Sequence, residues 1–270
     1  MFEIIKALIL GVIEGFTEFL PISSTGHLIV AEKIVNFHDR NEIFTVVVQL
    51  GAIAAVVWYY RKDLWEKTLG FFRRDKAALN FWKILVIGTI PAGLVGLLLD
   101  SSMGKIAVPF FVAVSLIIGG VILWFVDNKP VGRNTKTESS EIKTKQAILV
   151  GLGQSISVIP GVSRSGASIV SGLLVGLNRS TATAFSFYLS IPIMVVASGY
   201  KLLKYGSEIG QITGGWLGVV VGTMAAFVTA LLAIKWLLGY IARHNFRAFA
   251  IYRVAFGFFL LLLIAAGVLV

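Results

Sequence analysis

Two carboxylates lie close together near the amino terminus. Glu14 and Glu18 are four positions apart in the apolar stretch MFEIIKALILGVIEGFTEF, so on a helix they share a face with Gly11 and Gly15. Two neighbouring carboxylates resist joint ionisation unless a cation lies between them or they share a proton. The pair therefore indicates a divalent-cation site or a general base. The simpler alternative is an interfacial half-helix whose acids are only solvated.

A run of hydroxyl residues with one histidine follows these acids. Ser23, Ser24, Thr25 and His27 stand in PISSTGH, directly before the apolar run LIVAEKIV. At a helix start, free backbone N–H groups and the positive end of the helix dipole favour an anion. One hydroxyl would be enough for a plain helix cap, so the richer run indicates an anion site with His27 as an acid–base group.

A second polar motif, PGVSRSGAS, interrupts another apolar stretch further along the chain. It places Arg164 between Ser163 and Ser165 and adds Ser168 one helical turn later. The guanidinium is a planar fork that suits phosphate oxygens. The alternative is that Arg164 pairs with one of the two acids near the amino terminus, which is compatible with a phosphate taking over the arginine when it binds.

The composition places these side chains in a membrane. Of 270 residues, 57% are hydrophobic and 14% are charged, and several apolar runs approach the roughly 20 residues that span a bilayer. Cysteine is absent, which excludes disulfides, thiol nucleophiles and thiolate metal ligands. The net charge of +10 is concentrated in short loops, which favours contacts with anionic lipid over nucleic acid. The first segment lacks a basic leader and a cleavage site, so we expect it to be retained.

We expect a single all-α integral membrane domain over residues 1–270, with six spans and two broken segments. The spans are expected at 44–60, 84–99, 108–126, 182–203, 216–238 and 249–269. The broken segments, 4–35 and 147–177, are interrupted by Pro, Gly and hydroxyl residues, and each resembles two re-entrant half-helices. Non-helical backbone at membrane depth is tolerated only where protein or a watery cavity satisfies it, so both breaks should line a cavity.

The two broken segments resemble each other at a shift of 140 residues. The shift aligns Gly11 with Gly151, Glu14 with Gln154, Ser23 with Ser163, Thr25 with Ser165 and Gly26 with Gly166. Three spans follow each break, so the second copy enters the membrane from the opposite side. We therefore expect an inverted-topology repeat: repeat one over 1–126, a linker over 127–146 and repeat two over 147–270.

Loop charges predict the orientation. The loop 61–83, the linker 127–146 and the loop near 243–247 are all basic and fall on one side, which is cytoplasmic by the positive-inside rule. The first broken segment then enters from the outer face and the second from the inner face, with both termini outside.

At the two polar motifs the sequence resembles the bacterial undecaprenyl-diphosphate phosphatases linked to bacitracin resistance. The family's first motif, (E/Q)-x-x-x-E, corresponds to Glu14 to Glu18, and PISSTGH follows at the familiar distance. Its second motif, P-G-x-S-R-S-x-x-T, corresponds to residues 160–168, with Ser168 where the pattern often has threonine. The resemblance covers essentially the whole chain, including the repeat and the six spans.

The resemblance implies hydrolysis of undecaprenyl diphosphate to the monophosphate and inorganic phosphate, which recycles the lipid carrier of cell-wall precursors. It implies a multi-pass protein of the bacterial inner membrane, with an active site open to the outer, periplasmic face. Arg164 would grip the diphosphate. Hydroxyls would donate to it from five residues: Ser23, Thr25, Ser163, Ser165 and Ser168.

The remaining roles follow within that resemblance. Glu14 and Glu18 would hold Mg²⁺ or Ca²⁺, or act as base. Ser24 is the expected nucleophile, activated by Glu18 or His27, and His27 would then protonate the leaving phosphate. A phosphohistidine at His27 and direct attack by water are the alternatives.

Two further questions stay open in the sequence. A carrier or flippase for a prenyl phosphate lipid would share the inverted repeat and the broken helices, although it would not need the gathered acid, hydroxyl, histidine and arginine side chains. The small-residue row Gly218, Gly222 and Ala226 fits helix packing either within the monomer or across a homodimer.

Overall fold

The computed structural model describes residues 2–39, 42–103, 108–127 and 141–269, and every regular element in this part of the chain is helical. The long apolar helices are α3 (Ile43–Tyr59), α5 (Lys76–Met103), α6 (Pro109–Asp127), α9 (Arg179–Tyr205), α10 (Gly215–Ile241) and α11 (Arg247–Ala265). Within the described residues, five helices are long and apolar enough to cross a membrane, or six when α3 is counted together with the helix that follows it. The predicted all-α, multi-pass membrane fold is therefore confirmed.

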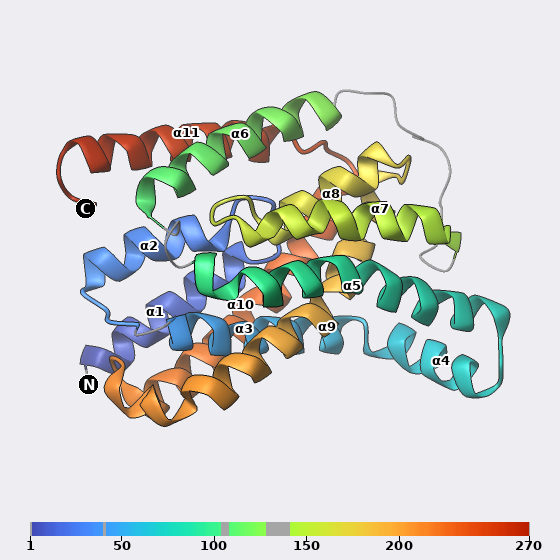
Figure 1. Ribbon diagram of the computed structural model, residues 1–270, viewed down its shortest axis with the longest axis horizontal. Helices are drawn as coiled ribbons and strands as arrows, with labels where there is room; N and C mark the ends of the chain where they lie inside the picture. The colour runs from blue at the N-terminus through green and yellow to red at the C-terminus, as the bar shows by residue number, and fades with distance from the viewer. Residues whose placement is uncertain (1, 40–41, 104–107, 128–140, 270) are drawn as a thin grey trace.

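Two shorter helix pairs turn back inside the bundle (Figure 1). The first consists of α1 (Phe2–Thr17) and α2 (Ser24–Val35); the second consists of α7 (Thr144–Ser155), the 3₁₀ turn η3 (Ile156–Val158) and α8 (Arg164–Leu174). Helix α1 starts at the end of the bundle where both chain termini lie, and α7 starts at the opposite end. The two hairpins thus enter from opposite ends, as the inverted repeat predicts.

The two breaks share an unusual backbone conformation. Ser23 has φ 69° and ψ 101°, and Ser163 has φ 73° and ψ 117°; each directly precedes the second helix of its hairpin. Positive φ is uncommon for a residue with a side chain and stores strain that the surrounding structure must hold. Positions 23 and 163 are also matched by the 140-residue shift, so the repeat extends to backbone geometry.

The repeat boundaries stay a prediction, because residues 128–140 of the expected linker lie outside the described residues.

The last residue of α6, directly before the expected linker, connects this helix to two others. Asp127 accepts hydrogen bonds from Arg179 Nε at 2.6 Å and from the Phe246 backbone N–H at 2.7 Å. This buried carboxylate ties α6 to the starts of α9 and α11.

The basic stretch 61–83, expected as a loop, is mostly helical. Helix α4 (Arg61–Phe72) leaves α3 at an angle of 72°, and α5 already begins at Lys76 rather than Ile84. The stretch contains one glycine and no proline, so nothing in it prevents helix formation. Helix α4 exposes Trp65 and Phe72 beside its basic residues, which is the composition of a helix lying at a membrane surface.

Helix α10 packs closely against α1 and α3. A Cβ added to Gly11 would lie 2.3 Å from the Gly222 carbonyl oxygen, and one added to Gly15 would lie 2.3 Å from the Ala226 carbonyl oxygen. A Cβ on Gly218 would likewise meet Ala7 at 3.4 Å. The row of small residues on α10 is therefore used within the monomer, where it holds the first hairpin in place.

Candidate active site

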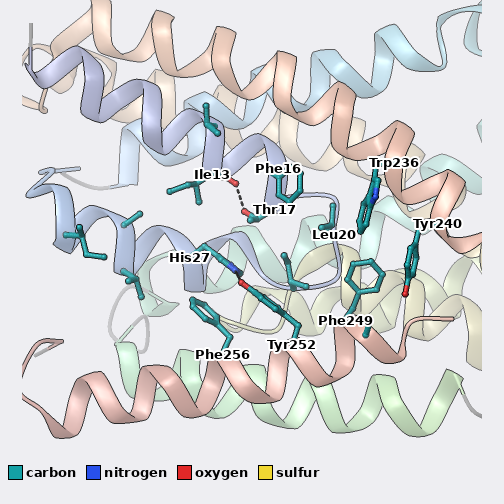
Figure 2. A pocket seen from close by; sticks show the side chains of 16 residues that line it. Ile13, Phe16, Thr17, Leu20, His27, Trp236, Tyr240, Phe249, Tyr252 and Phe256 are labelled. Carbon is teal, nitrogen blue, oxygen red and sulfur yellow. Dashed lines mark hydrogen bonds between the residues drawn. The ribbon is translucent and has the colours of Figure 1, made fainter. Parts of the chain in front are cut away.

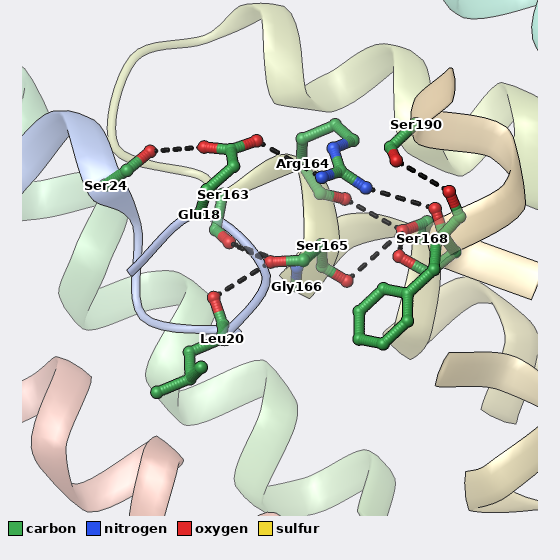
Figure 3. A network of polar contacts seen from close by, with 11 residues as sticks. Glu18, Leu20, Ser24, Ser163, Arg164, Ser165, Gly166, Ser168 and Ser190 are labelled. Atoms are coloured by element: carbon green, nitrogen blue, oxygen red, sulfur yellow. Dashed lines mark hydrogen bonds and ion pairs between the residues drawn. The ribbon is translucent and has the colours of Figure 1, made fainter. Parts of the chain in front are cut away.

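The tips of the two hairpins meet and bring the two sequence motifs together (Figure 3). Arg164, the first residue of α8, lies 3.2 Å from Glu18 in the first break, although the two are 146 positions apart. Ser165 donates its hydroxyl to the Leu20 carbonyl oxygen at 2.9 Å. The site is therefore an interface between the two halves of the chain.

Glu18 connects the candidate nucleophile to the arginine. Ser24 Oγ donates to Glu18 Oε2 at 2.6 Å, while Glu18 Oε1 faces Arg164 Nη2. The side chains of Glu18 and Ser24 are both buried. A carboxylate that already accepts the hydroxyl proton of a serine is placed to act as its general base.

Glu14 is buried, and neither of its carboxylate oxygens has a hydrogen-bond partner among the described residues. It lies near enough to Glu18 and Arg164 for their charges to act on it. A buried carboxylate without a partner is unfavourable, so this group needs a proton or a cation. The described part of the chain contains no group of three or more His, Cys, Asp or Glu side chains that is placed to hold a metal ion. The two carboxylates still fit Mg²⁺ or Ca²⁺, because Mg²⁺ commonly takes one or two carboxylates and completes its shell with water and phosphate oxygens.

The guanidinium of Arg164 is fixed by contacts with protein groups and has one N–H group that donates to none of the described residues. Its Nη1 donates to the Ser186 carbonyl oxygen at 3.1 Å, its guanidinium lies 5.4 Å from the ring centre of Phe19, and its Nε is buried without a partner. A fixed guanidinium with a free N–H can add a phosphate oxygen to its existing contacts. The alternative considered for Arg164, a pairing with an acid near the amino terminus, is present and involves Glu18.

The three serines of the second motif already have protein partners. Ser163 Oγ accepts from the Gly166 N–H at 3.1 Å and lies 3.0 Å from Ser165 Oγ. Ser168 Oγ lies 2.6 Å from Ser186 Oγ and also donates within its own helix. In this structure these hydroxyls join the second break to α9 and to the first break.

The first motif divides into buried and outward-facing hydroxyls. Ser23 Oγ is buried and has no hydrogen-bond partner among the described residues, so it is available to a ligand. Thr25 is exposed and stands apart from the buried network.

His27 faces away from the serine. Its Nδ1 lies 2.7 Å from the Ser23 carbonyl oxygen, its Nε2 lies 2.6 Å from Tyr252 Oη, and its ring stacks on Phe256 at 4.3 Å between centres. Among the hydrogen bonds of the described residues, Ser24 donates to Glu18, and none joins Ser24 to His27. The two ends of the first motif therefore face different parts of the site.

A large apolar cavity begins at His27 (Figure 2). Its volume is about 720 Å³, and it lies between the first hairpin, α10 and α11. Its walls are almost entirely apolar or aromatic and include Phe16, Leu20, Ile22, Trp236, Phe249 and Phe256. A cavity of this kind next to charged groups suits a ligand with an anionic head and a hydrocarbon tail.

Arg253 on α11 is a site residue that the sequence analysis missed. It is 1% exposed, and its guanidinium donates to five carbonyl oxygens: those of Pro21, Ser115, Leu116, Gly161 and Val162. Two glycines make room for it, since a Cβ on Gly119 would lie 2.1 Å from its Nη2 and one on Gly166 would lie 2.7 Å from its Nη1.

Arg253 thus fastens both breaks to each other and to α6. Non-helical carbonyls at membrane depth need internal donors, and this one side chain supplies several of them. The signal was present in the sequence, because a single arginine inside an apolar span indicates a functional or structural site.

The comparisons with known proteins agree with this geometry. A family model described as bacitracin resistance protein BacA matches residues 7–259. An undecaprenyl-diphosphatase of Acinetobacter baumannii is 44% identical over 267 residues, covering 98% of this chain and 96% of the relative. Undecaprenyl-diphosphatase 1 of Burkholderia lata is 45% identical over 270 residues, with 98% and 96% of the two chains covered.

The matched region contains every residue of the site, from Glu14 in the first hairpin to Arg253 in α11. The match also extends over most of α1 and α11 and over every described helix between them. The chain therefore belongs to the family of the bacitracin resistance protein BacA.

Proposed function

We propose that this protein hydrolyses undecaprenyl diphosphate to undecaprenyl monophosphate and inorganic phosphate. The observation that carries the proposal is the continuous contact from Arg164 through Glu18 to Ser24, next to an apolar cavity of about 720 Å³. The curated relatives are named undecaprenyl-diphosphatases and match along nearly their whole length. This reaction returns the lipid carrier to cell-wall synthesis and underlies bacitracin resistance.

The geometry favours Ser24 as the attacking group. Its oxygen bonds to the terminal phosphorus as its proton passes to Glu18, the bridging P–O bond breaks, and that electron pair leaves with the lipid monophosphate. Water then hydrolyses the phosphoserine and releases inorganic phosphate. Arg164 and the amides at the start of α8 stabilise the charge on the transferring group. The 2.6 Å contact with Glu18 favours this route over a phosphohistidine at His27 or direct attack by water.

Glu14 and Glu18 are proposed to hold the divalent cation, Mg²⁺ or Ca²⁺, because Glu14 is otherwise a buried and unpartnered carboxylate. The ion would neutralise charge on the bound diphosphate. Chelation should therefore lower phosphate release by about tenfold or more, and Glu18→Gln should be inactive at any metal concentration. Full activity in excess chelator would contradict a role for the divalent cation in the reaction.

The site is further proposed to open toward the outer face of the inner membrane. The first hairpin, which carries Ser24, enters from the end of the bundle where both termini lie, and the basic helix α4 lies at the other end. Basic residues tend to stay on the cytoplasmic side, which supports an outer position for the first hairpin.

Phosphate release by the purified chain distinguishes this enzyme from a carrier of similar architecture. With undecaprenyl diphosphate in detergent, the proposal requires stoichiometric inorganic phosphate and undecaprenyl monophosphate. A carrier or flippase would leave the diphosphate intact under the same conditions, and that result would overturn the proposal.

A further inference from the structure

Both ring nitrogens of His27 are engaged in the structure. A carbonyl oxygen can only accept a hydrogen bond, so the 2.7 Å contact with the Ser23 carbonyl places a proton on Nδ1. In the neutral ring, Nε2 is then an acceptor, and Tyr252 donates its hydroxyl to it at 2.6 Å. His27 therefore has no free N–H to offer to a substrate while these two contacts persist.

Helix α11 holds this arrangement rigidly. Tyr252 and Phe256 are one turn apart on α11; the ring planes of His27 and Tyr252 are 1° from parallel, and the ring of Phe256 stacks on the histidine. Tyr252 is 42% exposed, and both it and His27 line the apolar cavity, with the Tyr252 hydroxyl directed at the histidine ring (Figure 2). Thr17, another hydroxyl residue that lines the cavity, already donates to the Ile13 carbonyl oxygen.

We propose that Tyr252 is a catalytic residue that passes the proton of His27 to the lipid-linked phosphate; this inference rests on the proposed function. As the bridging P–O bond breaks, its electron pair stays on the oxygen of the departing monophosphate. In the protonated form of His27, Nε2 donates to the Tyr252 oxygen, which leaves the tyrosine proton free. The Tyr252 hydroxyl gives this proton to the departing oxygen and takes the Nε2 proton of His27, which ends neutral. When water hydrolyses the phosphoserine, its oxygen stays in the inorganic phosphate, and the proton that it releases returns to His27 before the next turnover.

This proton relay, from His27 through Tyr252 to the lipid-linked phosphate, also implies an orientation for the substrate. Ser24 and Arg164 serve the terminal phosphate at the junction of the hairpins, whereas Tyr252 and His27 face the cavity and serve the phosphate that carries the prenyl chain. Departure of this phosphate is the step in which a proton donor assists.

The test uses two substrates that differ in one atom. Undecaprenyl diphosphate is compared with an analogue in which sulfur bridges the two phosphorus atoms, because a thiophosphate leaves readily without a proton. Tyr252→Phe keeps the ring stack and removes only the hydroxyl. On the oxygen-bridged substrate, Tyr252→Phe and His27→Ala should each lower kcat by about 100-fold, and the double variant should lose no more than the worse single variant. On the sulfur-bridged analogue, all three should recover to within about threefold of the parent.

Controls separate this role from a structural one. Tyr200→Phe removes a tyrosine hydroxyl whose partner is Lys204, away from both site and cavity, and should match the parent on both substrates. The thermal stability of Tyr252→Phe should equal that of the parent, and its KM should stay within about threefold. Equal losses on both substrates, or a Tyr252→Phe kcat close to that of the parent, would overturn the relay. If the parent itself released no phosphate, the proposed function would fall, and the relay with it.

Discussion

At the scale of single residues, the site depends on Glu18, which accepts from Ser24 with one oxygen and faces Arg164 with the other. The ion pair therefore fixes the carboxylate that we propose as the base for Ser24. In the proposed mechanism Arg164 has two functions, since it orients Glu18 and offers a free donor to the phosphate. Both need the planar fork of a guanidinium as well as its charge.

Arg164→Lys tests this dual role, because lysine keeps the charge and loses the fork. We expect transition-state stabilisation to fall by about 2–4 kcal/mol, which lowers kcat/KM by about 30- to 1000-fold. The measurement is steady-state phosphate release. Arg179→Lys is the matched control, since it alters an arginine paired with Asp127 at the far end of α6 and should leave turnover per folded molecule near that of the parent. An Arg164→Lys enzyme with more than half of the parental kcat/KM would refute the role.

The motifs could identify most site residues but not their contacts. Ser24, Glu18 and Arg164 stand in recognisable spacings, and the structure brings them together. The orientation of His27 could not be predicted, because it depends on Tyr252, which lies 225 positions away. Arg253 could have been found as a lone charge in an apolar span, but its five carbonyl partners come from three separate segments.

At the scale of elements, glycines bring α1 close to α10 and so fix the first hairpin. Gly11 and Gly15 face backbone atoms of Gly222 and Ala226 at distances that leave no space for a side chain. Glu14 and Glu18 lie on the same hairpin, so a displacement of α1 would move both carboxylates relative to Arg164.

Gly11→Ala should therefore impair both stability and activity. The added Cβ would lie 2.3 Å from a backbone oxygen that no side-chain rotation can move away. We expect the free energy of unfolding to fall by about 1–3 kcal/mol, the usual range for overpacking, measured by thermal denaturation in detergent. Gly239→Ala is the control: nothing lies within 4 Å of its added Cβ, so it should be neutral or slightly stabilising. Equal stability of the two variants would contradict the close packing of α1.

Hydropathy predicted the long helices, but it could not predict how the chain behaves where it leaves the membrane. Helix α4 was expected as a loop because its charges suggested one, yet charged residues without Pro form helices readily. The broken segments were identified because Pro, Gly and hydroxyl residues interrupt an apolar run. The positive φ values of Ser23 and Ser163 were not predictable, since serine gives no sign of that conformation and only tertiary contacts hold it.

At the scale of the whole molecule, the hairpins that enter from opposite ends place a reactive centre inside the bundle. Each hairpin supplies half of the candidate site: the first carries Glu14, Glu18 and Ser24, which we propose as the nucleophile, and the second carries Arg164. Arg253 of α11 holds the two tips together through carbonyls of both breaks. A fold of this kind gives a charged headgroup access to the site while its tail stays in an apolar cavity.

This architecture predicts opposite labelling of two surface positions. The chain has no cysteine, so single cysteines can be introduced without a background. Glu66→Cys in the exposed face of α4 should react only with reagents on the cytoplasmic side, and Ser207→Cys in the turn η4 (Gly206–Gln211) only with reagents outside. An impermeant maleimide applied to intact cells and to inverted vesicles measures this. Labelling of both positions from one side would contradict the topology.

The central claim is that Ser24, with Glu18 as its base, takes the terminal phosphate of the lipid. Acid quenching of the purified protein during turnover, with undecaprenyl diphosphate labelled at its terminal phosphorus, tests it directly, because phosphoserine survives acid. The account predicts label on the peptide that contains Ser24 and none in Ser24→Ala, whose turnover should fall by about a thousandfold or more. Ser198→Ala, which changes a buried serine bonded to the Val46 carbonyl, should label like the parent. Label that is retained on the peptide containing His27 after an alkaline quench but lost after the acid quench, as expected for phosphohistidine, would contradict the account. A Ser24→Ala variant that keeps a tenth of normal turnover would contradict it as well.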